Sequence, residues 1–252
     1  GDAKDTYQSL TRILGCHSGY FLHWLSQNLP SQNLEYFNHW NSLQNQVSAT
    51  LPKALKEVEF GEYTALDLVL SKVPKISKLH LANSMAVRYV NFLGKREQEI
   101  ICNRGTSGID GSNSTAVGCT FTTKDPVTLI TGDMAFFYDR NAFWHNYTMP
   151  NLRIVVLNNH AGGIFRLIDG PAKQPELEEY FETKQKLNAY HLAQEFGFEY
   201  ILVKNELELR HHLESFYSPS LKPKILEIET TSFKNAEILK SVKAKIKDTL
   251  LG

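Results

Sequence analysis

The sequence has few cysteines, no excess of charge of either sign and no long hydrophobic run. Its three cysteines, Cys16, Cys102 and Cys119, contain no CxxC pair. We therefore expect neither a disulfide framework nor a thiolate metal site, and we expect a reducing, cytoplasmic location. The 27 Lys and Arg residues balance 27 Asp and Glu residues, so no overall charge favours nucleic acid or an anionic membrane. No apolar run approaches the roughly 18 residues of a membrane helix, and residues 1–10 do not resemble a signal peptide.

Two common nucleotide-binding loops are also missing from the sequence. No predicted strand is followed by GxGxxG, and there is no GxxxxGK[ST] segment, which disfavours dinucleotide and P-loop binding. The chain has 252 residues, of which 42% are hydrophobic and 21% are charged, as is typical of a globular protein. This length accommodates one large domain, or one domain with a piece of another.

The composition changes near residue 50. Residues 1–50 are rich in Asn, Gln, Ser and aromatic residues, and we expect short helices around residues 22–25 and 34–47. This part shows no alternation of strands and helices. A small helical domain is one interpretation, but we favour the end of a domain that begins further upstream.

From about Leu51 onward, predicted strands alternate with predicted helices. The expected strands cover residues 77–84, 99–105, 126–133, 153–159, 199–203 and 224–230. The expected helices cover residues 63–73, 85–94, 112–122, 136–147, 187–197, 206–217 and 236–250. Such alternation predicts an α/β fold, a doubly wound parallel sheet flanked by helices on both faces.

Polar residues end four of the predicted strands, and ligands of open parallel sheets bind beyond such carboxyl ends. The four pairs are Asn83–Ser84, Asn103–Arg104, Gly132–Asp133 and Asn158–Asn159. The carboxylate of Asp133 and the amide oxygen of Asn159 suit Mg²⁺, which completes its coordination with water and phosphate oxygens. Gly162 and Gly163 allow a phosphate to approach the backbone closely. The alternative is a helix N-cap and a turn, and we favour the ligand site because both pairs end strands.

The segment "TGDMAFFYDRNAFWHNYTMPNLRIVVLNNHAGG" resembles the thiamine-diphosphate-binding signature, which runs from Gly-Asp-Gly to Asn-Asn. The resemblance implies that Asp133, Asn159 and the backbone carbonyl of Ala161 hold the Mg²⁺ of the cofactor diphosphate, with Mn²⁺ as the alternative metal. Met134 departs from the pattern, because the signature usually has glycine at this position.

Two further segments, "LANSMAVRYV" and "NRGTSGIDGSNSTAVG", resemble the 2-succinyl-5-enolpyruvyl-6-hydroxy-3-cyclohexene-1-carboxylate synthase family of menaquinone biosynthesis. Members of that family also tolerate a bulky residue where Met134 stands. The resemblance implies a transferase that decarboxylates 2-oxoglutarate and adds the succinyl unit to isochorismate. It assigns substrate contacts to Asn83, Ser84, Arg88 and Arg104. It assigns cofactor contacts to Ser107, Ile109, Gly132, Asp133, Met134, Ala135, Asn159, Ile164 and Phe165.

Without the resemblance, these residues also have ordinary structural interpretations. Ile109, Ile164 and Phe165 suit a hydrophobic core, while Arg88 and Arg104 suit a solvated helix face and a loop ion pair. Arginine nevertheless binds carboxylates in a bidentate manner, and both implied substrates carry carboxylates. We assign no catalytic role to His160, and we place His211 and His212 on a solvated helix face.

The resemblance also implies that the activating glutamate of the cofactor belongs to an N-terminal pyrimidine-binding domain and comes from a partner subunit. Nothing in the 252 residues matches that domain, so we assign no catalytic residue here and expect the chain alone to be inactive. Residues 1–50 are then the end of the middle domain with a linker, and residues 51–252 are the diphosphate-binding domain of a homodimer or homotetramer. The alternatives are an acetolactate synthase, a 2-oxoacid decarboxylase or a non-catalytic nucleotide-binding module.

Overall fold

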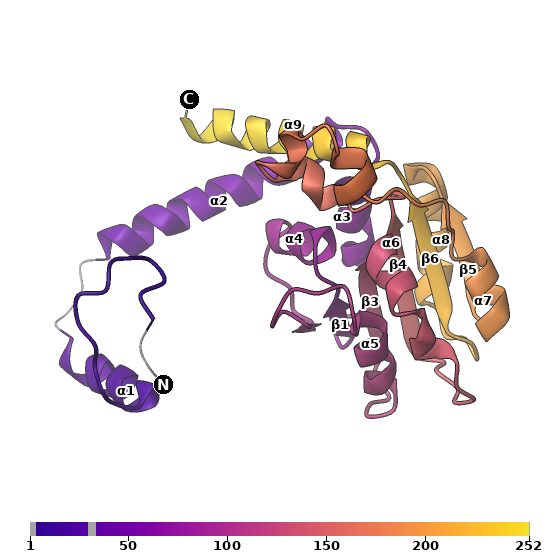
Figure 1. Ribbon diagram of the computed structural model, residues 1–252, viewed down its shortest axis with the longest axis horizontal. Coiled ribbons are helices and arrows are strands. Elements are labelled where there is room, and N and C mark those ends of the chain that lie inside the picture. The colour runs from indigo at the N-terminus through magenta and orange to yellow at the C-terminus, as the bar shows by residue number, and fades with distance from the viewer. Residues whose placement is uncertain (1–3, 30–33, 252) are drawn as a thin grey trace. The chain divides into compact units, whose positions relative to one another are not determined.

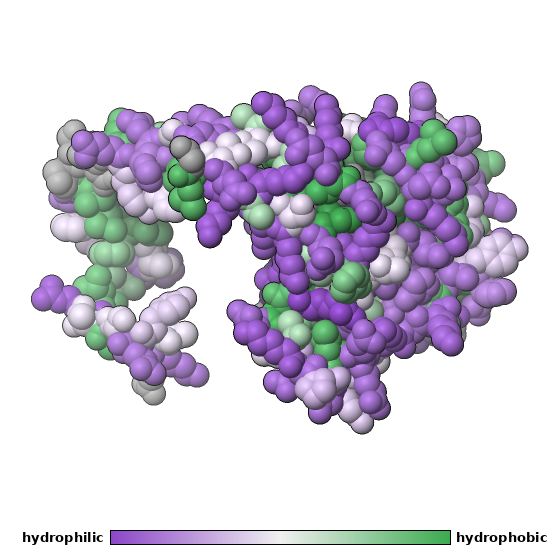
Figure 2. Space-filling model, turned by 90° about the horizontal axis from the view of Figure 1, so that it is seen from above, coloured by the Kyte–Doolittle hydropathy of each residue, from purple (hydrophilic) through white to green (hydrophobic). Residues whose placement is uncertain are grey.

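The computed structural model describes residues 4–29 and 34–251, and the chain divides into two units, Gly1–Asn45 and Gln46–Gly252. The smaller unit holds helix α1 (Ser18–Asn28) and the start of helix α2 (Glu35–Lys56). None of its described residues is buried, and Figure 2 shows hydrophobic side chains on its surface. Its described part therefore has no core of its own. Its assignment to the end of a preceding domain stays a prediction.

The larger unit is built on one sheet of six parallel strands in the order β2-β1-β3-β4-β6-β5 (Figure 1). The strands are β1 (Lys78–Leu81), β2 (Glu99–Cys102), β3 (Val127–Gly132), β4 (Leu152–Asn158), β5 (Glu199–Val203) and β6 (Lys224–Glu229). The prediction of a doubly wound parallel sheet is confirmed. Because the chain passes from β1 to β2 on one side and returns to β3 on the other, the order reverses between β1 and β3. Ligands of such folds bind at this reversal.

Helices cover both faces of the sheet and form two hydrophobic cores. One face carries α3 (Glu62–Lys72), α4 (Met85–Phe92), α8 (Glu206–Tyr217), α9 (Ser232–Leu251) and the end of α2. The other carries α5 (Ser112–Thr120), α6 (Asp133–Tyr138) and α7 (Tyr190–Phe196). Within residues 4–29 and 34–251, no helix has the length and apolar character needed to cross a bilayer.

Strand β4 shows why its sequence is a continuous apolar run. Ile154 and Val156 belong to one core, and Val155 and Leu157 belong to the other. All four side chains are buried. A strand with both faces covered needs apolar residues at every position, and it does not show the alternation of a half-exposed strand.

The helix expected over residues 136–147 is wrong in both of its bounds. Helix α6 begins at Asp133 and ends at Tyr138, and a 3₁₀ turn follows over Arg140–Phe143. The side-chain amide of Asn113 donates to the carbonyl oxygens of Phe136 and Asp139, at 2.8 and 3.1 Å. The Asp139 carboxylate in turn accepts from the backbone N–H of Ser114 at 2.8 Å. These contacts with α5 end the helix early.

Two other differences concern segments around the carboxyl edge of the sheet. Helix α9 begins at Ser232, earlier than the expected residue 236. Residues 163–181 form short helical turns that the periodicity did not predict, over Gly163–Leu167, Pro171–Lys173 and Leu177–Phe181. Segments this short contain too few residues to show a helical period.

Gly61 fixes the start of α3, and we predict that Gly61→Ala destabilises the fold. A Cβ at residue 61 would lie 2.5 Å from Ile238 Cδ1 and 2.8 Å from Asn235 Oδ1. Because both atoms end side chains that can shift slightly, we expect a loss of about 1–2 kcal/mol in the free energy of unfolding. Chemical denaturation measures it.

Gly118→Ala is the matched control. Gly118 lies in α5, and a Cβ there would meet nothing within 4 Å, so alanine should leave stability unchanged or raise it. Equal effects of the two substitutions would contradict the proposed close packing at Gly61.

Candidate functional site

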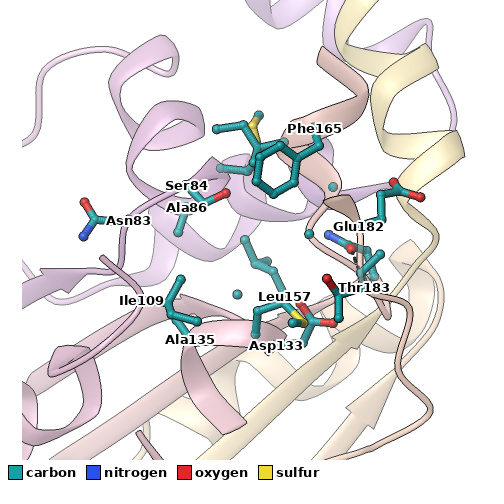
Figure 3. Close-up of a pocket in the computed structure, with 18 of the residues that line it drawn as sticks. Asn83, Ser84, Ala86, Ile109, Asp133, Ala135, Leu157, Phe165, Glu182 and Thr183 are labelled. Carbon is teal, nitrogen blue, oxygen red and sulfur yellow. Dashed lines mark hydrogen bonds between the residues drawn. The ribbon is translucent and has the colours of Figure 1, made fainter. Parts of the chain in front are cut away.

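A cavity of about 510 Å³ lies at the carboxyl edge of the sheet, where the strand order reverses. Figure 3 shows Asp133 and Leu157 at the sheet edge, with Phe165 across the cavity and Ile109 to one side. The predicted site residues that line the cavity are Asn83, Ser84, Arg88, Ser107, Ile109, Gly132, Asp133, Met134, Ala135, Asn159, Ala161, Ile164 and Phe165. Residues from the ends of three neighbouring strands thus meet in one place, as parallel pairing requires.

Arg104 does not line the cavity. Its side chain is exposed, and its Nη1 donates to Asn83 Oδ1 at 3.1 Å. Arg88 does line the cavity, and its Nη1 donates to the carbonyl oxygen of Ser84 at 2.7 Å. The structure therefore places one predicted arginine at the cavity and the other beside it, joined through Asn83.

Asn83 connects the ends of β1 and β2. Its side-chain amide is buried and donates to the carbonyl oxygens of Asn103 and Gly108, at 2.7 and 2.6 Å. These bonds hold the loop that carries Ile109 against the end of β1. Asn83 thus shapes the cavity wall through its own hydrogen bonds.

Around this edge, four residues that are not glycine have left-handed backbone angles: Thr183, which lines the cavity and has a φ of 49°, and three residues in loops just after strands. Ser84, Ser107 and His160 have φ values of 68°, 61° and 61°. Such conformations cost on the order of 1 kcal/mol or more each, and they concentrate where loops are held for function. The latter three belong to loops that follow a strand of the sheet. The tight turns bring the backbone close to the cavity.

Asp133 is buried at the start of α6, directly after β3. Gln185 Nε2 donates to Asp133 Oδ2 at 2.8 Å and to Asn158 Oδ1 at 3.1 Å. Burial raises the pKa of the Asp133 carboxyl to about 6, although Gln185 and two backbone N–H groups oppose that rise. The negative charge of this carboxylate is therefore costly in the absence of a cation.

Asn159 is held by a residue that the sequence analysis missed. Its Nδ2 donates to Glu62 Oε1 at 2.6 Å, and its Oδ1 accepts from the backbone N–H of Ala161 at 3.1 Å. Glu62 is the first residue of α3, is buried and lines the cavity. Burial, with a smaller contribution from the nearby charge of Asp133, raises the pKa of Glu62 to about 7 against the opposing effect of the hydrogen bond from Asn159.

Nothing in the local sequence marks Glu62 or Gln185 as buried at this site. A glutamate in the first turn of a helix usually lies in solvent, where its negative charge interacts favourably with the helix dipole. Gln185 lies in a segment with neither strand nor helix periodicity. Either residue could be predicted only if it were known which chain segments meet at the carboxyl edge of the sheet.

Gly163 packs directly against Asn159. A Cβ at residue 163 would lie 3.2 Å from Asn159 Nδ2, closer than ordinary contact. The sequence analysis expected the glycine pair to allow a close approach of phosphate. The structure shows that one of the glycines also permits the close approach of Asn159.

The donor set at this edge fits a hard divalent cation. Within the described part of the chain, neither Glu62 nor Asp133 is paired with a lysine or arginine side chain. The Asp133 carboxylate, the Asn159 amide oxygen and the Ala161 carbonyl are oxygen donors of the kind that Mg²⁺ prefers. No cluster of three or more His, Cys, Asp or Glu residues among the described residues forms a metal cage. The protein donors therefore suit a cation that brings other ligands, such as a diphosphate.

Comparison with known families identifies the class of protein to which this site belongs. The family model described as "Thiamine pyrophosphate enzyme, C-terminal TPP binding domain" matches residues 82–228. Since this match covers more than half of the chain, the chain belongs to the thiamine pyrophosphate enzymes through this domain. Thiamine pyrophosphate is another name for thiamine diphosphate, the cofactor that the family resemblance implies.

Individual relatives give a finer comparison. The chain is 51% identical over 98% of its length to a 2-succinyl-5-enolpyruvyl-6-hydroxy-3-cyclohexene-1-carboxylate synthase of Cytophaga hutchinsonii, covering 45% of that protein. It is 45% identical over 73% of its length to the synthase of Christiangramia forsetii, covering 32% of that protein. These names confirm the family resemblance inferred from the sequence. The chain spans less than half the length of these relatives.

A solved structure supports the fold independently. Benzoylformate decarboxylase from Polynucleobacter necessarius superimposes with a TM-score of 0.57 at 16% sequence identity. The match covers 68% of this chain and 33% of that one. At this level of identity the similarity concerns the fold alone.

We predict that Asp133→Asn stabilises the metal-free chain at neutral pH. Because the folded-state pKa is raised from 3.8 to about 6, the charged form destabilises the fold, and the penalty grows as the pH rises through that interval. Asparagine removes the charge and should add about 3 kcal/mol at pH 7. Thermal unfolding at pH 7 and pH 3.5 measures the effect, which should vanish at the lower pH.

Asp169→Asn is the control for this substitution. The Asp169 side chain is 98% exposed, so its neutralisation should leave the melting temperature nearly unchanged at both pH values. A lower melting temperature for Asp133→Asn at pH 7 would contradict the view that this carboxylate is short of positive charge.

Proposed function

We propose that this chain supplies the diphosphate-binding part of a 2-succinyl-5-enolpyruvyl-6-hydroxy-3-cyclohexene-1-carboxylate synthase. One observation carries the proposal: a single cavity is lined by metal-type oxygen donors and by Arg88, a carboxylate-binding type of side chain. Chains named as this synthase are similar to almost the whole of the sequence. The complete enzyme would decarboxylate 2-oxoglutarate and transfer the succinyl unit to isochorismate.

The chain's own residues would bind and orient the cofactor. Asp133, Asn159 and the Ala161 carbonyl would hold Mg²⁺, or Mn²⁺ in its place, together with the diphosphate. Ile109 is 37% exposed at the side of the cavity, where it would support the apolar part of the cofactor. Thiamine diphosphate, when bound, supplies an electron sink for the decarboxylation of a 2-oxo acid.

Arg88 and Arg104 would bind the carboxylates of the substrates. Arg88 lines the cavity, and Arg104 lies beside it, bonded to Asn83 of the cavity wall. The planar guanidinium group binds a carboxylate in a bidentate manner, so both side chains would orient anionic substrates. Ser84, which also lines the cavity, would donate a further hydrogen bond.

The rest of the proposal concerns the assembled protein. Residues 1–50 would belong to the middle domain and its linker, and a pyrimidine-binding domain of a partner subunit would supply the activating glutamate in a homodimer or homotetramer. We also keep the prediction of a cytoplasmic location without nucleic acid partners. Another thiamine-diphosphate enzyme, of the acetolactate synthase or 2-oxoacid decarboxylase type, would give a different product from the full-length protein.

Replacement of the arginines by lysine tests the substrate assignment. Arg88→Lys and Arg104→Lys keep the charge but lose the planar fork, so kcat/KM of the full-length enzyme should fall roughly 10- to 150-fold for at least one substrate. The affinity for thiamine diphosphate should stay within about threefold, as measured by calorimetry. Equal losses in cofactor affinity would move both arginines to the cofactor site.

The chain by itself should fold but should not turn over substrate. Without the activating glutamate, general acid–base help worth typically 10²–10⁴-fold is missing. The purified chain is mixed with Mg²⁺, thiamine diphosphate, 2-oxoglutarate and isochorismate, and the loss of isochorismate is followed. Turnover at the rate of a full-length synthase would show that these residues already contain the complete machinery.

A further inference from the structure

Glu62 reaches the cavity from a firmly held helix start. Its backbone N–H donates to Asn235 Oδ1 at 3.0 Å, and the close packing of Gly61 fixes the residue before it. The Glu62 side chain is 1% exposed, and the hydroxyl of Tyr89 in α4 donates to its carboxyl group. Burial of a carboxyl group costs free energy unless the group is hydrogen-bonded, so the contacts of Glu62 offset part of that cost.

The contacts of Asn159 fix which end of its amide faces which neighbour. Glu62 Oε1 accepts from Nδ2, and the backbone N–H of Ala161 donates to Oδ1. A flipped amide would place two acceptors together at Glu62 and two donors together at Ala161. Both contacts therefore select the same orientation.

This orientation turns the oxygen of Asn159 toward Asp133. The backbone N–H of Ala161 also interacts with the Asp133 carboxylate, so Asn159 Oδ1 and Asp133 lie around the same N–H group. The opposite amide end, Nδ2, points at Glu62 and carries no lone pair for a metal. Only the observed orientation presents two oxygen donors side by side.

We propose that Glu62 is a positioning residue that holds Asn159 Nδ2, so that Asn159 Oδ1 stays beside Asp133 as a ligand for the cation of a bound diphosphate. The proposal rests on the proposed function, because it concerns the metal of that same site. Partners of this kind, which touch a ligand and not the metal, typically change metal affinity 10- to 100-fold when they are removed.

The test compares two substitutions in the full-length protein. Glu62→Leu removes the acceptor at similar volume, and Glu62→Gln keeps an acceptor oxygen for Asn159. Calorimetric titration of Mg²⁺ at saturating thiamine diphosphate gives the metal affinity. We expect a 10- to 100-fold loss for Glu62→Leu and a loss within about threefold for Glu62→Gln. At saturating Mg²⁺, the substrate KM values should stay within about threefold for both variants.

Tyr89→Phe is the matched control, because it removes the other side-chain partner of Glu62 and leaves Asn159 untouched. Its Mg²⁺ affinity should stay within about threefold of the unchanged protein. Circular dichroism checks the fold of every variant, and Glu62→Ala replaces Glu62→Leu if the latter does not fold, with the same expected loss.

Each result separates the positioning role from the proposed function. Unchanged Mg²⁺ affinity in the variants without an acceptor would overturn the positioning role, and so would an equal loss in Glu62→Gln. If the unchanged protein binds thiamine diphosphate without any need for Mg²⁺, the proposed metal site itself fails, and the role of Glu62 fails with it. A loss for Glu62→Leu that Glu62→Gln restores supports both.

Discussion

Parallel pairing between β3 and β4 brings the polar ends of both strands to one level of the sheet. Gly132 stands opposite Leu157 in the register, so Asp133 and Asn159 follow within one or two residues of the same hydrogen-bonded row. β1 pairs with the other side of β3, which places Asn83 and Ser84 at that edge as well. The cavity exists because three buried strands end together and their next residues must turn away from the sheet.

Several polar groups at this edge are buried and are hydrogen-bonded to one another. Asn158 Nδ2 donates to Glu227 Oε1 at 2.6 Å, deep in the sheet, and Asn158 Oδ1 accepts from Gln185, which also holds Asp133. Such a network is stabilising only when every member is paired. This network explains the two adjacent amides at the end of β4: Asn158 ties the edge to the sheet, and Asn159 lines the cavity.

The same arrangement makes the site costly in the absence of a cation. Burial raises the pKa of Asp133 and of Glu62, and neither carboxyl has a lysine or arginine partner among the described residues. The burial of apolar side chains in the two cores on either face of the sheet stabilises the fold and offsets the cost of these buried carboxyl groups. Carboxylates that are kept free of lysine and arginine partners remain available to a cation, but they lower the free energy of unfolding of the protein without the cation.

The order of hydrophobic and polar residues in the sequence was sufficient for the fold class and for the polar strand ends of the site, whereas the roles of Ile109 and of the two arginines were implied by the family resemblance. Apolar strands that end in Asp133 and Asn159 indicate a ligand edge, because the backbone geometry of parallel sheets fixes where such ends lie. The bounds of α6 were not predictable, because Asn113 ends that helix from a different segment. Glu62 and Gln185 were not predictable either, since Glu62 contacts Asn159 across 97 residues of sequence and Gln185 contacts Asp133 across 52. The sequence by itself determined which strands end in metal-type ligands. Only the tertiary structure decided which side chains orient those ligands, because a hydrogen bond between distant segments leaves no periodic pattern in the chain.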